Sequence, residues 1–456
     1  MRFRVRCLDR HPGAPPASQV LAALPAHTPA VLLDDAVGLQ MLAWDPDRRL
    51  HGAVKPGTRR GGRGDWAYAE GDVGQRLVQA VADETWEHEA GLPHLGPGWC
   101  GWLGYECGHA YEAYPWHPPA ADGWPDYHAA RFRKALVWVE GEEALLLHAE
   151  AEGAPETEAE TVVARREATE LLATAASLEV EEMSLELSPR LGRARFEEQV
   201  RRLRGWIGEG ELFQANLSHE LATAFRGDPR RLYAARRRNQ PTTMASYWQD
   251  GRGRALLSQS PELFLAVQGQ ELTTRPIKGT APRGGDEAAD REQAVALARD
   301  RKERAELTMI VDMARNDLGR VARTGSVVVD TPGEVEGFPT LFHRTAQVRA
   351  RWDPRLGLDR LLAATFPPAS ITGAPKVRAL EAIAELEQRR RGPYCGSLFH
   401  LIPGLQPQAR FSVLIRTARV GDGELVLPVG AGIVWDSDPA REWEETLLKG
   451  RYLEGP

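Results

Sequence analysis

Cysteine is scarce in this sequence, and its four cysteines follow no pattern that would join them in a metal or redox site. Cys7, Cys100, Cys107 and Cys395 form no Cys-x-x-Cys pair and no ligand cluster with histidine. The sequence therefore does not indicate a zinc site or a fold stabilised by disulfide bonds, and free thiols in a reducing compartment are expected. We accordingly expect a cytoplasmic protein.

Long apolar segments and a surplus of positive charge are missing as well. No run of about 18 apolar residues occurs, so no membrane-spanning helix is expected. No apolar stretch of the signal-peptide type follows the basic N-terminus. The net charge of −7 argues against general nucleic-acid binding, which favours basic patches. We expect neither a membrane nor a nucleic acid as a partner.

The glycine patterns of the common nucleotide-binding folds are absent or incomplete. No Gly-x4-Gly-Lys-Ser/Thr sequence occurs, and Gly430-Ala431-Gly432 is only part of a dinucleotide fingerprint. Two interpretations of these glycines stay open. They can present backbone N–H groups to a carboxylate, or they can allow tight packing within a sheet.

Hydrophobic periodicity predicts several regular elements in the second half. Helices are expected over residues 191–208, most of 286–321 and 439–452. Residues 411–420 and 424–434 are predicted to form two paired strands across a glycine-rich turn.

The chain of 456 residues is 42% hydrophobic, which permits a large core. The stretch 149–188 is rich in alanine and glutamate, and we interpret it as the joint between two regions. These are an N-terminal region, 1–188, and a second region, 189–456, which holds the motifs. We expect the N-terminal region to be intertwined with the core, with strands in both layers.

A lysine in an extended segment and turn is the first candidate for chemistry. In Arg275-Pro276-Ile277-Lys278-Gly279-Thr280, the proline disfavours helix at the residue before it, and the glycine permits unusual backbone angles. Lys278 is therefore expected on a fixed turn, where a partly desolvated lysine can act as a nucleophile. From these residues alone, a solvated lysine beside a hairpin is the alternative.

Glu262, in Ser260-Pro261-Glu262-Leu263, precedes Lys278 by 16 residues, which is enough for two strands and a turn. The two side chains could therefore share one pocket. A carboxyl group in an apolar site has a raised pKa and can donate a proton to a leaving hydroxyl. An ordinary surface glutamate after a proline is the alternative.

Acidic side chains on two predicted helices could bind a metal ion. Glu306 lies on an apolar helix face, and Glu442 and Glu445 share a face of the last helix. Such carboxylates suit Mg²⁺, which takes a few protein oxygens and completes its shell with water and substrate. From these residues alone, ordinary surface charge, with Glu445 paired to Lys449, is the favoured alternative.

Two further residues, His343 and Arg416, are candidates for function although each lies outside the motifs described above. His343 follows a Gly-Phe-Pro turn, and a lone histidine is more often structural than catalytic. Arg416 lies within an apolar strand, where an arginine needs an anionic partner from the protein or a ligand.

These segments occur in one order that resembles the chorismate-using enzymes of the anthranilate synthase and aminodeoxychorismate synthase group. The resemblance covers nearly all of residues 190–456 and is weaker before them. The Pro-Ile-Lys-Gly-Thr sequence around Lys278 is similar to that of the aminodeoxychorismate synthase branch, whereas anthranilate synthases typically have alanine at this lysine. The other similar segments are residues 210–218, 258–264, 302–321, 336–340, 366–380, 415–417 and 430–449.

The resemblance implies an α+β fold in which two antiparallel β-sheets pack as a sandwich core with helices on the outside. It also implies a reaction in which Lys278 attacks C2 of chorismate while Glu262 protonates the departing C4 hydroxyl. Ammonia from a separate glutamine amidotransferase subunit would then add at C4. The product, 4-amino-4-deoxychorismate, belongs to 4-aminobenzoate and folate synthesis.

The family also implies roles for the remaining candidates. Mg²⁺ on Glu306 and Glu445, with Glu442, would bind the ring carboxylate, with His343 nearby. The backbone of residues 430–432 would assist, and Arg416 would bind the enolpyruvyl carboxylate. Thr280 and Lys449 are further candidates for contact with the substrate.

The sequence departs from the family pattern at functionally relevant places. Phe399-His400 stands where relatives commonly have Gly-Tyr, and His400 is our candidate for replacing that tyrosine at the enolpyruvyl carboxylate. Asp35 stands where relatives often have a serine that contacts bound tryptophan. A tryptophan site would comprise Leu33, Asp34 and Phe213.

Three other functions are weighed against the first. An anthranilate synthase large component would let ammonia attack C2, and Lys278 argues against it. An isochorismate or salicylate synthase would use water, with its activating lysine elsewhere. A catalytically idle or tryptophan-sensing subunit would have no need of Lys278, Glu262 and Glu306 together.

Overall fold

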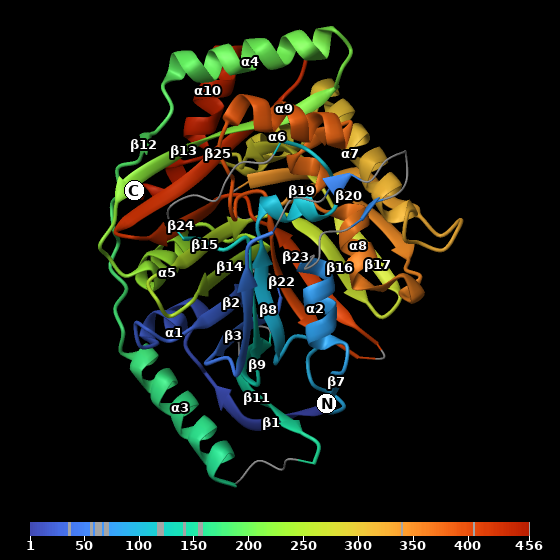
Figure 1. Ribbon diagram of the computed structural model, residues 1–456. Helices are drawn as coiled ribbons and strands as arrows, with labels where there is room; N and C mark the ends of the chain where they lie inside the picture. Colours follow the sequence, from blue (N-terminus) through green and yellow to red (C-terminus); the bar gives the residue numbers. More distant parts are fainter. Residues whose placement is uncertain are drawn as a thin grey trace.

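A computed structural model describes residues 1–34, 38–54, 58–59, 66–67, 73–115, 123–139, 143–153, 158–338, 341–404 and 406–455. In these residues most strands belong to two large sheets, and the helices lie around them (Figure 1). The α-helices are α1 (Ala17–Ala23), α2 (Val73–Val81), α3 (Glu158–Ala176), α4 (Arg193–Gly208), α5 (Pro229–Asn239), α6 (Glu287–Arg299), α7 (Arg301–Gly319), α8 (Gly357–Thr365), α9 (Lys376–Glu387) and α10 (Pro439–Leu448). Short 3₁₀ helices are η1 (Tyr105–Ala110), η2 (Pro354–Leu356), η3 (Ala369–Ile371) and η4 (Arg451–Leu453).

The larger sheet has 13 strands, in the order β12-β13-β25-β24-β15-β14-β2-β3-β10-β11-β1-β7, with β21 paired to β13. The β1–β7 pair is parallel, and the other pairs described are antiparallel. Its strands are β1 (Arg2–Pro12), β2 (Ala30–Asp34), β3 (Gln40–Trp44), β7 (Thr85–His88), β10 (Lys134–Val139), β11 (Glu143–Ala151), β12 (Ser188–Pro189), β13 (Gln214–Ala224), β14 (Met244–Gln249), β15 (Ala255–Ser260), β21 (Gly373–Ala374), β24 (Thr417–Gly421) and β25 (Glu424–Ile433).

The second sheet has ten strands, in the order β18-β20-β17-β16-β23-β22-β8-β9-β4, with β19 paired to β20. Strands from before residue 150 therefore occur in both sheets, while the boundary at residue 188 stays a prediction. Its strands are β4 (Arg48–Gly52), β8 (Gly98–Leu103), β9 (Tyr127–Phe132), β16 (Leu263–Gln268), β17 (Glu271–Arg275), β18 (Ile277–Pro282), β19 (Val328–Gly337), β20 (Leu341–Arg351), β22 (Ser397–Ile402) and β23 (Gln408–Val413); β5 (Thr58–Arg59) pairs separately with β6 (Trp66–Ala67).

Large apolar side chains from both sheets meet in the space between them. Trp102 of β8 and Trp248 of β14 are both buried and pack edge to face, with ring centroids 5.7 Å apart. Leu398 of β22 joins them from the second sheet. Such aromatic pairs bury much apolar surface and are favoured in an edge-to-face arrangement. The predicted sandwich of two sheets is confirmed.

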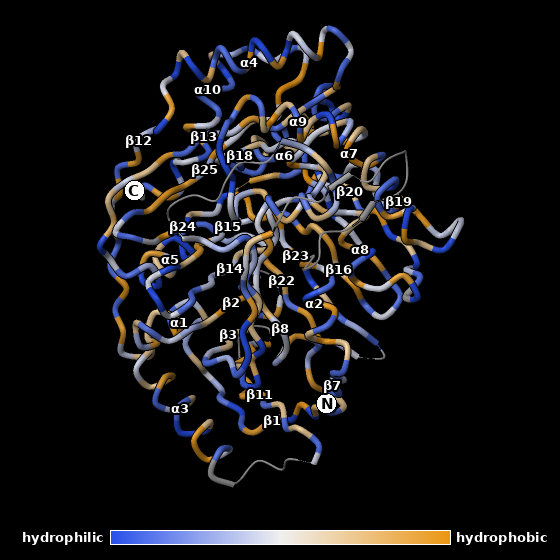
Figure 2. Tube along the Cα trace, in the orientation of Figure 1, coloured by the Kyte–Doolittle hydropathy of each residue, from blue (hydrophilic) through white to orange (hydrophobic). Residues whose placement is uncertain are grey.

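Helices cover the outer faces of the sheets (Figure 1). Helices α1, α3 and α5 share one apolar cluster with the larger sheet, and α2, α7 and α8 share another with the second sheet. Helices α4, α9 and α10 pack against β13 and β25. In Figure 2 the peripheral helix α4 is largely hydrophilic, which is consistent with a helix that buries only one stripe.

The predicted strand 411–420 is wrong, because the chain changes sheet within it. Strand β23 ends at Val413 in the second sheet, and β24 begins at Thr417 in the larger one. Arg416 lies at the crossing with φ +47°, a left-handed conformation that does not occur inside a strand. Its carbonyl still accepts a hydrogen bond from Gln259 N–H at 2.9 Å. The backbone conformation at this crossing between the sheets, rather than the alternation of a strand, therefore determines the direction of the Arg416 side chain.

The predicted helix within 286–321 consists of two helices that meet at Asp300. The Asp300 carboxylate accepts a hydrogen bond from Glu303 N–H at 3.0 Å and so caps the start of α7. Because α7 begins here, Glu303 and Glu306 lie one turn apart on the same helix face.

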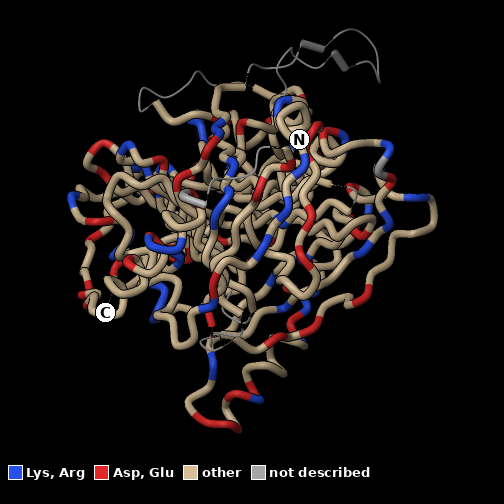
Figure 3. The backbone as a smooth tube through the Cα atoms, turned by 90° about the horizontal axis from the view of Figure 1, so that it is seen from below, with Lys and Arg blue, Asp and Glu red and all other residues tan. Residues whose placement is uncertain are grey.

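In the view of Figure 3, lysine and arginine positions are interspersed with aspartate and glutamate positions along the described chain. None of the helices described is both long and apolar enough to cross a membrane.

Candidate active site

A cavity of about 430 Å³ lies where the second sheet, α7, β25 and α10 approach one another. Its volume is in the range of ordinary ligand pockets. The residues predicted for catalysis, substrate binding and metal binding line it, apart from Ala431 and His400. Those it brings together are Glu262, Lys278, Thr280, Glu306, His343, Arg416, Gly430, Gly432, Glu442, Glu445 and Lys449.

Lys278 projects into this cavity from β18. The pairing of β18 with β20 shifts by one residue between Lys278 and Thr280, and Gly279 has φ +80° at that bulge. Lys278 Nζ lies 3.8 Å from a Glu306 carboxylate oxygen. A side chain at Gly432 would place its Cβ 3.4 Å from the same Nζ, so the glycine leaves the ammonium group room. Lys278 therefore lies at a bulge within strand β18 rather than on the predicted turn, and this bulge is where its side chain enters the cavity.

Glu262 lies across the same cavity in the turn between β15 and β16. It is 4% exposed, and its carboxylate accepts a hydrogen bond from the Ser370 hydroxyl. Burial raises the pKa of Glu262 to about 7, although the Ser370 hydroxyl and the charge of Lys278 act in the opposite direction. A carboxyl group with this pKa is partly protonated at neutral pH and can serve as a general acid.

Four carboxylates enter the cavity from two helices that are distant in sequence. Helix α7 supplies Glu303 and Glu306, and α10 supplies Glu442 and Glu445. Burial raises the pKa of Glu303 and Glu442, and the like charge of a neighbouring glutamate adds to each effect. Burial would also raise the pKa of Glu445, but the ion pair with Lys449 at 2.7 Å outweighs it and lowers that pKa.

These oxygen donors are of the kind that Mg²⁺ prefers, and their repulsion would be relieved by a cation. Within the described residues, no three His, Cys, Asp or Glu side chains already lie close enough together to hold a metal ion. Glu306, Glu442 and Glu445 are the residues that could hold such an ion.

His343 faces the cavity from β20 and is held by its neighbour on β18. Its Nδ1 lies 3.0 Å from the Thr280 hydroxyl. Burial lowers the pKa of His343 to about 4, and the positive charge of Arg416 contributes. The ring is therefore neutral at pH 7, and it can exchange hydrogen bonds with a ligand without adding charge.

Arg416 presents its guanidinium group to the cavity without an acidic partner. Among the described residues no carboxylate lies within ion-pair distance of it, and burial lowers its pKa. A buried guanidinium requires an anion, and its planar donors match a carboxylate. Since the described residues supply none, a ligand carboxylate is the natural partner.

The end of β25 forms one wall of the cavity. Strand β24 pairs with β25 only as far as Val426, while β13 continues along the other edge to Ile433. Backbone groups of residues 430–432 can therefore reach a ligand. Lys449 Nζ donates to the Gly430 carbonyl at 2.9 Å. The Ala431 side chain is fully buried against α4 and α9, so any contribution of this residue comes from its backbone.

His400 is not in the cavity, and its predicted role at a substrate carboxylate is wrong. It lies on β22 opposite Cys100 of β8, and its Nε2 is 2.8 Å from the Gly96 carbonyl. Burial lowers the pKa of His400 to about 4. None of the cavity-lining residues belongs to β22, so the position of this strand in the second sheet places His400 outside the cavity.

The three residues predicted for a tryptophan site do not come together. Leu33 and Asp34 line a cavity of only about 20 Å³ between the sheets, with room for little more than one water-sized molecule. The buried Asp34 carboxylate is paired with Arg237 at 2.9 Å. Phe213 is 69% exposed and lies beside α7 instead. Asp35, like Pro339 and Thr340 of the 336–340 segment, lies outside the described residues.

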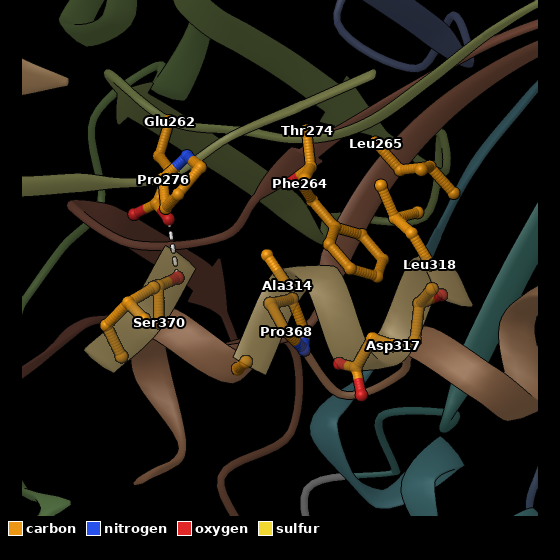
Figure 4. Close-up of a pocket in the computed structure, with 13 residues that line it drawn as sticks. Glu262, Phe264, Leu265, Thr274, Pro276, Ala314, Asp317, Leu318, Pro368 and Ser370 are labelled. Carbon is orange, nitrogen blue, oxygen red and sulfur yellow. Dashed lines mark hydrogen bonds between the residues drawn. The ribbon is translucent and has the colours of Figure 1, made fainter. Parts of the chain in front are cut away.

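Sequence reasoning missed several residues of the cavity wall. Tyr394 and Asn216 line it, and a Cβ at Gly430 would meet the Tyr394 hydroxyl at 2.8 Å. The Ser370 hydroxyl donates the hydrogen bond to the Glu262 carboxylate (Figure 4). No local pattern marks these three residues. Glu303, by contrast, lies one turn before Glu306 and could have been found from helical spacing.

The model of the chorismate binding enzyme family matches residues 40–454 of the chain. The chain belongs to the chorismate binding enzyme family. It is 41% identical over 257 residues to the aminodeoxychorismate synthase component 1 of Salmonella typhimurium, and 42% identical over 264 residues to the anthranilate synthase component 1 of Streptomyces coelicolor. These alignments cover 56% and 58% of this chain and 56% and 51% of the relatives, so the chain spans about half the length of the curated relatives it matches.

The fold of this chorismate binding enzyme is shared with solved structures. It superimposes on the anthranilate synthase component I of Streptococcus pneumoniae with a TM-score of 0.78 at 27% identity, covering 91% of this chain and 92% of that one. The curated relatives thus divide between two reactions, and the residues of the cavity have to distinguish them.

Proposed function

We propose that the chain is the component of an aminodeoxychorismate synthase that converts chorismate and ammonia to 4-amino-4-deoxychorismate. The observation that carries the proposal is the placement of Lys278 and the buried Glu262 in one cavity. A nucleophile and a general acid that face the same space can act on the two ends of one conjugated system.

In the proposed first step, the Lys278 amine forms a bond to C2 of chorismate and the two ring double bonds each shift by one position. The C4–oxygen bond breaks, and the hydroxyl leaves as water with the proton of Glu262. Glu262 is suited to this role because its pKa of about 7 keeps a proton available. Ammonia then adds at C4, the double bonds return, and the bond from C2 to Lys278 breaks.

The other cavity residues would hold the substrate in place. Arg416, which has no acidic partner among the described residues, would bind the enolpyruvyl carboxylate. The free edge of β25 and neutral His343 would lie at the ring carboxylate. Mg²⁺, when bound by the acidic residues of α7 and α10, would neutralise the ring carboxylate and favour attack at C2. Ammonia would come from a glutamine amidotransferase subunit in the cytoplasm, for folate synthesis.

Formation of anthranilate is the second candidate, because the Streptomyces coelicolor and Streptococcus pneumoniae relatives carry the name anthranilate synthase. In that reaction ammonia itself attacks C2, and a lysine at this position would have no covalent role.

Product identification separates the two candidates. The purified chain is incubated with chorismate, Mg²⁺ and excess ammonium chloride, alongside Lys278→Ala. We expect aminodeoxychorismate from the wild type, converted to 4-aminobenzoate by an added lyase, and only background from Lys278→Ala. Lys302→Ala is the matched control, since Lys302 lines the same cavity with a side chain that is 52% exposed. Fluorescent anthranilate as the main product would overturn the proposal.

A further inference from the structure

A second cavity, of about 140 Å³, is lined by residues of both sheets and shares no lining residue with the substrate cavity. Strands β4 and β9 of the second sheet contribute to it from one side. From the other side come the end of β14 and the turn that joins β14 to β15 in the larger sheet. A molecule bound in this cavity would therefore contact both sheets at once.

The turn between β14 and β15 has a defined conformation. The Asp250 carboxylate accepts hydrogen bonds from the N–H groups of Arg252 at 2.7 Å and Arg254 at 3.2 Å. Gly251 has φ +77°, and a Cβ at this position would approach the His27 carbonyl oxygen to 2.6 Å, so the turn lies close against the chain that precedes β2. The two arginines are therefore presented to the cavity from a fixed piece of backbone.

Positive charge exceeds negative charge at the rim of this cavity. Arg49 of β4 lines it together with Arg252 and Arg254, whereas Asp250 is the acidic residue among its described lining residues. Asp250 pairs with Arg254 at 3.5 Å. In the described part of the chain, Arg49 donates only to the Asp250 carbonyl, at 3.5 Å, and Arg252 has no acidic partner. Two guanidinium groups are thus available to an anion, and their planar donors match a carboxylate.

The inner wall of the cavity is aromatic. His51 and His128 lie opposite each other on β4 and β9, and their rings are parallel to within 6°. Trp248 of the larger sheet packs edge to face on His128, with ring centroids 4.8 Å apart. Both His128 and Trp248 are buried, and His128 Nδ1 has no hydrogen-bond partner among the described residues. This wall therefore offers aromatic rings to the body of a ligand.

The inner wall also carries little charge. Burial lowers the pKa of His128 to about 3, and the neighbouring His51 and Arg49 add to the effect. The His128 ring is therefore neutral at pH 7. Because the charged side chains lie at the rim and the neutral rings lie inside, the cavity suits a ligand with an anionic end and an apolar end.

The size of the cavity distinguishes between classes of anion. A volume of about 140 Å³ has room for about ten water-sized molecules. An inorganic phosphate ion would leave most of this space to water. A planar ring with one carboxylate group uses more of it, since the ring can pack against the aromatic inner wall while the carboxylate stays at the rim.

We propose that this cavity binds a small aromatic carboxylate, whose carboxylate group pairs with Arg49 and Arg252 and whose ring packs against the aromatic inner wall. The proposal goes beyond the proposed function, because the site is separate from the substrate cavity and does not depend on which reaction the chain performs. A ligand that contacts both sheets binds the folded chain alone. Its binding should therefore raise Tm.

Calorimetric titration of the full chain with benzoate tests the proposal. Benzamide, which has the same ring without the charge, and inorganic phosphate, which has charge without a ring, are the matched probes. We expect benzoate to bind more tightly than either, and its Kd to rise at least about tenfold in Arg49→Ala and in Arg252→Ala. Arg226→Ala is the control, because it removes an exposed arginine outside both cavities, and its Kd should stay within about twofold of the wild type.

Benzoate could also bind at Arg416 in the substrate cavity, so each titration is repeated in Arg416→Ala. Benzoate binding that disappears in Arg416→Ala belongs to the substrate cavity and overturns the proposal. The proposal is equally overturned by an unchanged Kd in both Arg49→Ala and Arg252→Ala, by equal affinity for benzamide, by tighter binding of phosphate, or by no binding of benzoate up to about 10 mM.

The thermal unfolding of the same proteins gives a second measurement. Arg49 and Arg252 are exposed, so their replacement by alanine should leave Tm without ligand unchanged. Benzoate should raise Tm of the wild type and of Arg226→Ala, and it should raise Tm of Arg252→Ala by less. An equal rise in all three proteins would place the bound benzoate elsewhere and overturn the proposal.

Discussion

The buried carboxyl group of Glu262 predicts an alkaline limit to the reaction. A general acid must be protonated, so kcat/KM for chorismate should fall as the pH rises through the pKa of about 7. About half of the molecules carry the proton at pH 7 and about one in a hundred at pH 9, which corresponds to a loss of roughly 50-fold. The direction follows from burial, which raises this pKa more than Ser370 and Lys278 lower it.

The assay is the initial rate of product formation between pH 6 and pH 9 at a constant concentration of free ammonia. Total ammonium is adjusted at each pH, because the neutral fraction would otherwise increase with pH. Glu262→Gln keeps the side chain's size and an acceptor for the Ser370 hydroxyl but has no acidic proton. We expect its rate to be lower by about 10²- to 10⁴-fold, without the alkaline decline.

Ser370→Ala offers a second, independent prediction from the same contact. The Ser370 hydroxyl donates a hydrogen bond to the Glu262 carboxylate and lowers the pKa of that group, so its removal should move the alkaline decline to higher pH.

A wild-type pH profile that is flat to pH 9 would refute the role of Glu262 as the general acid. The same decline in Glu262→Gln would show that another group titrates.

The remaining predictions concern substrate affinity, the metal ion and stability. Arg416→Ala should raise KM for chorismate by about 10- to 150-fold, the equivalent of about 1.5–3 kcal/mol for a charged hydrogen bond, and unaltered steady-state kinetics would place the carboxylate elsewhere. Glu445→Gln should raise the Mg²⁺ concentration for half-maximal rate by about tenfold or more, and activity that survives EDTA would exclude the metal. Arg391→Ala should lower the free energy of unfolding by about 1.5–3 kcal/mol in urea titrations, because buried Glu387 would lose the charged hydrogen bond from Arg391 at 2.6 Å and keep only the more distant Arg389 at 3.4 Å; a loss below about 1 kcal/mol would contradict this.

Local features could be predicted from the sequence because neighbouring residues determine them. Helix α4 ends at Gly208 as periodicity predicted, and α10 presents Glu442 and Glu445 on one side. The Pro-Ile-Lys-Gly-Thr segment is not helical, as predicted, but it forms a bulged strand rather than a turn, and Gly279 takes up the left-handed angle at the bulge. The resemblance of the ordered motifs added the fold and the family.

Only the tertiary structure decided which of these side chains meet, because strand register and burial depend on partners that are distant in sequence. The crossing between sheets brings Arg416 into the cavity, whereas β22, the strand of His400, supplies none of the cavity-lining residues. Ser370, more than 100 positions from Glu262, reaches its carboxylate only in the folded chain. Burial then gives Glu262 its raised pKa, because the interior desolvates the charged form. The composition of a segment does not contain that information, since the same carboxyl group on the surface would be an ordinary acid.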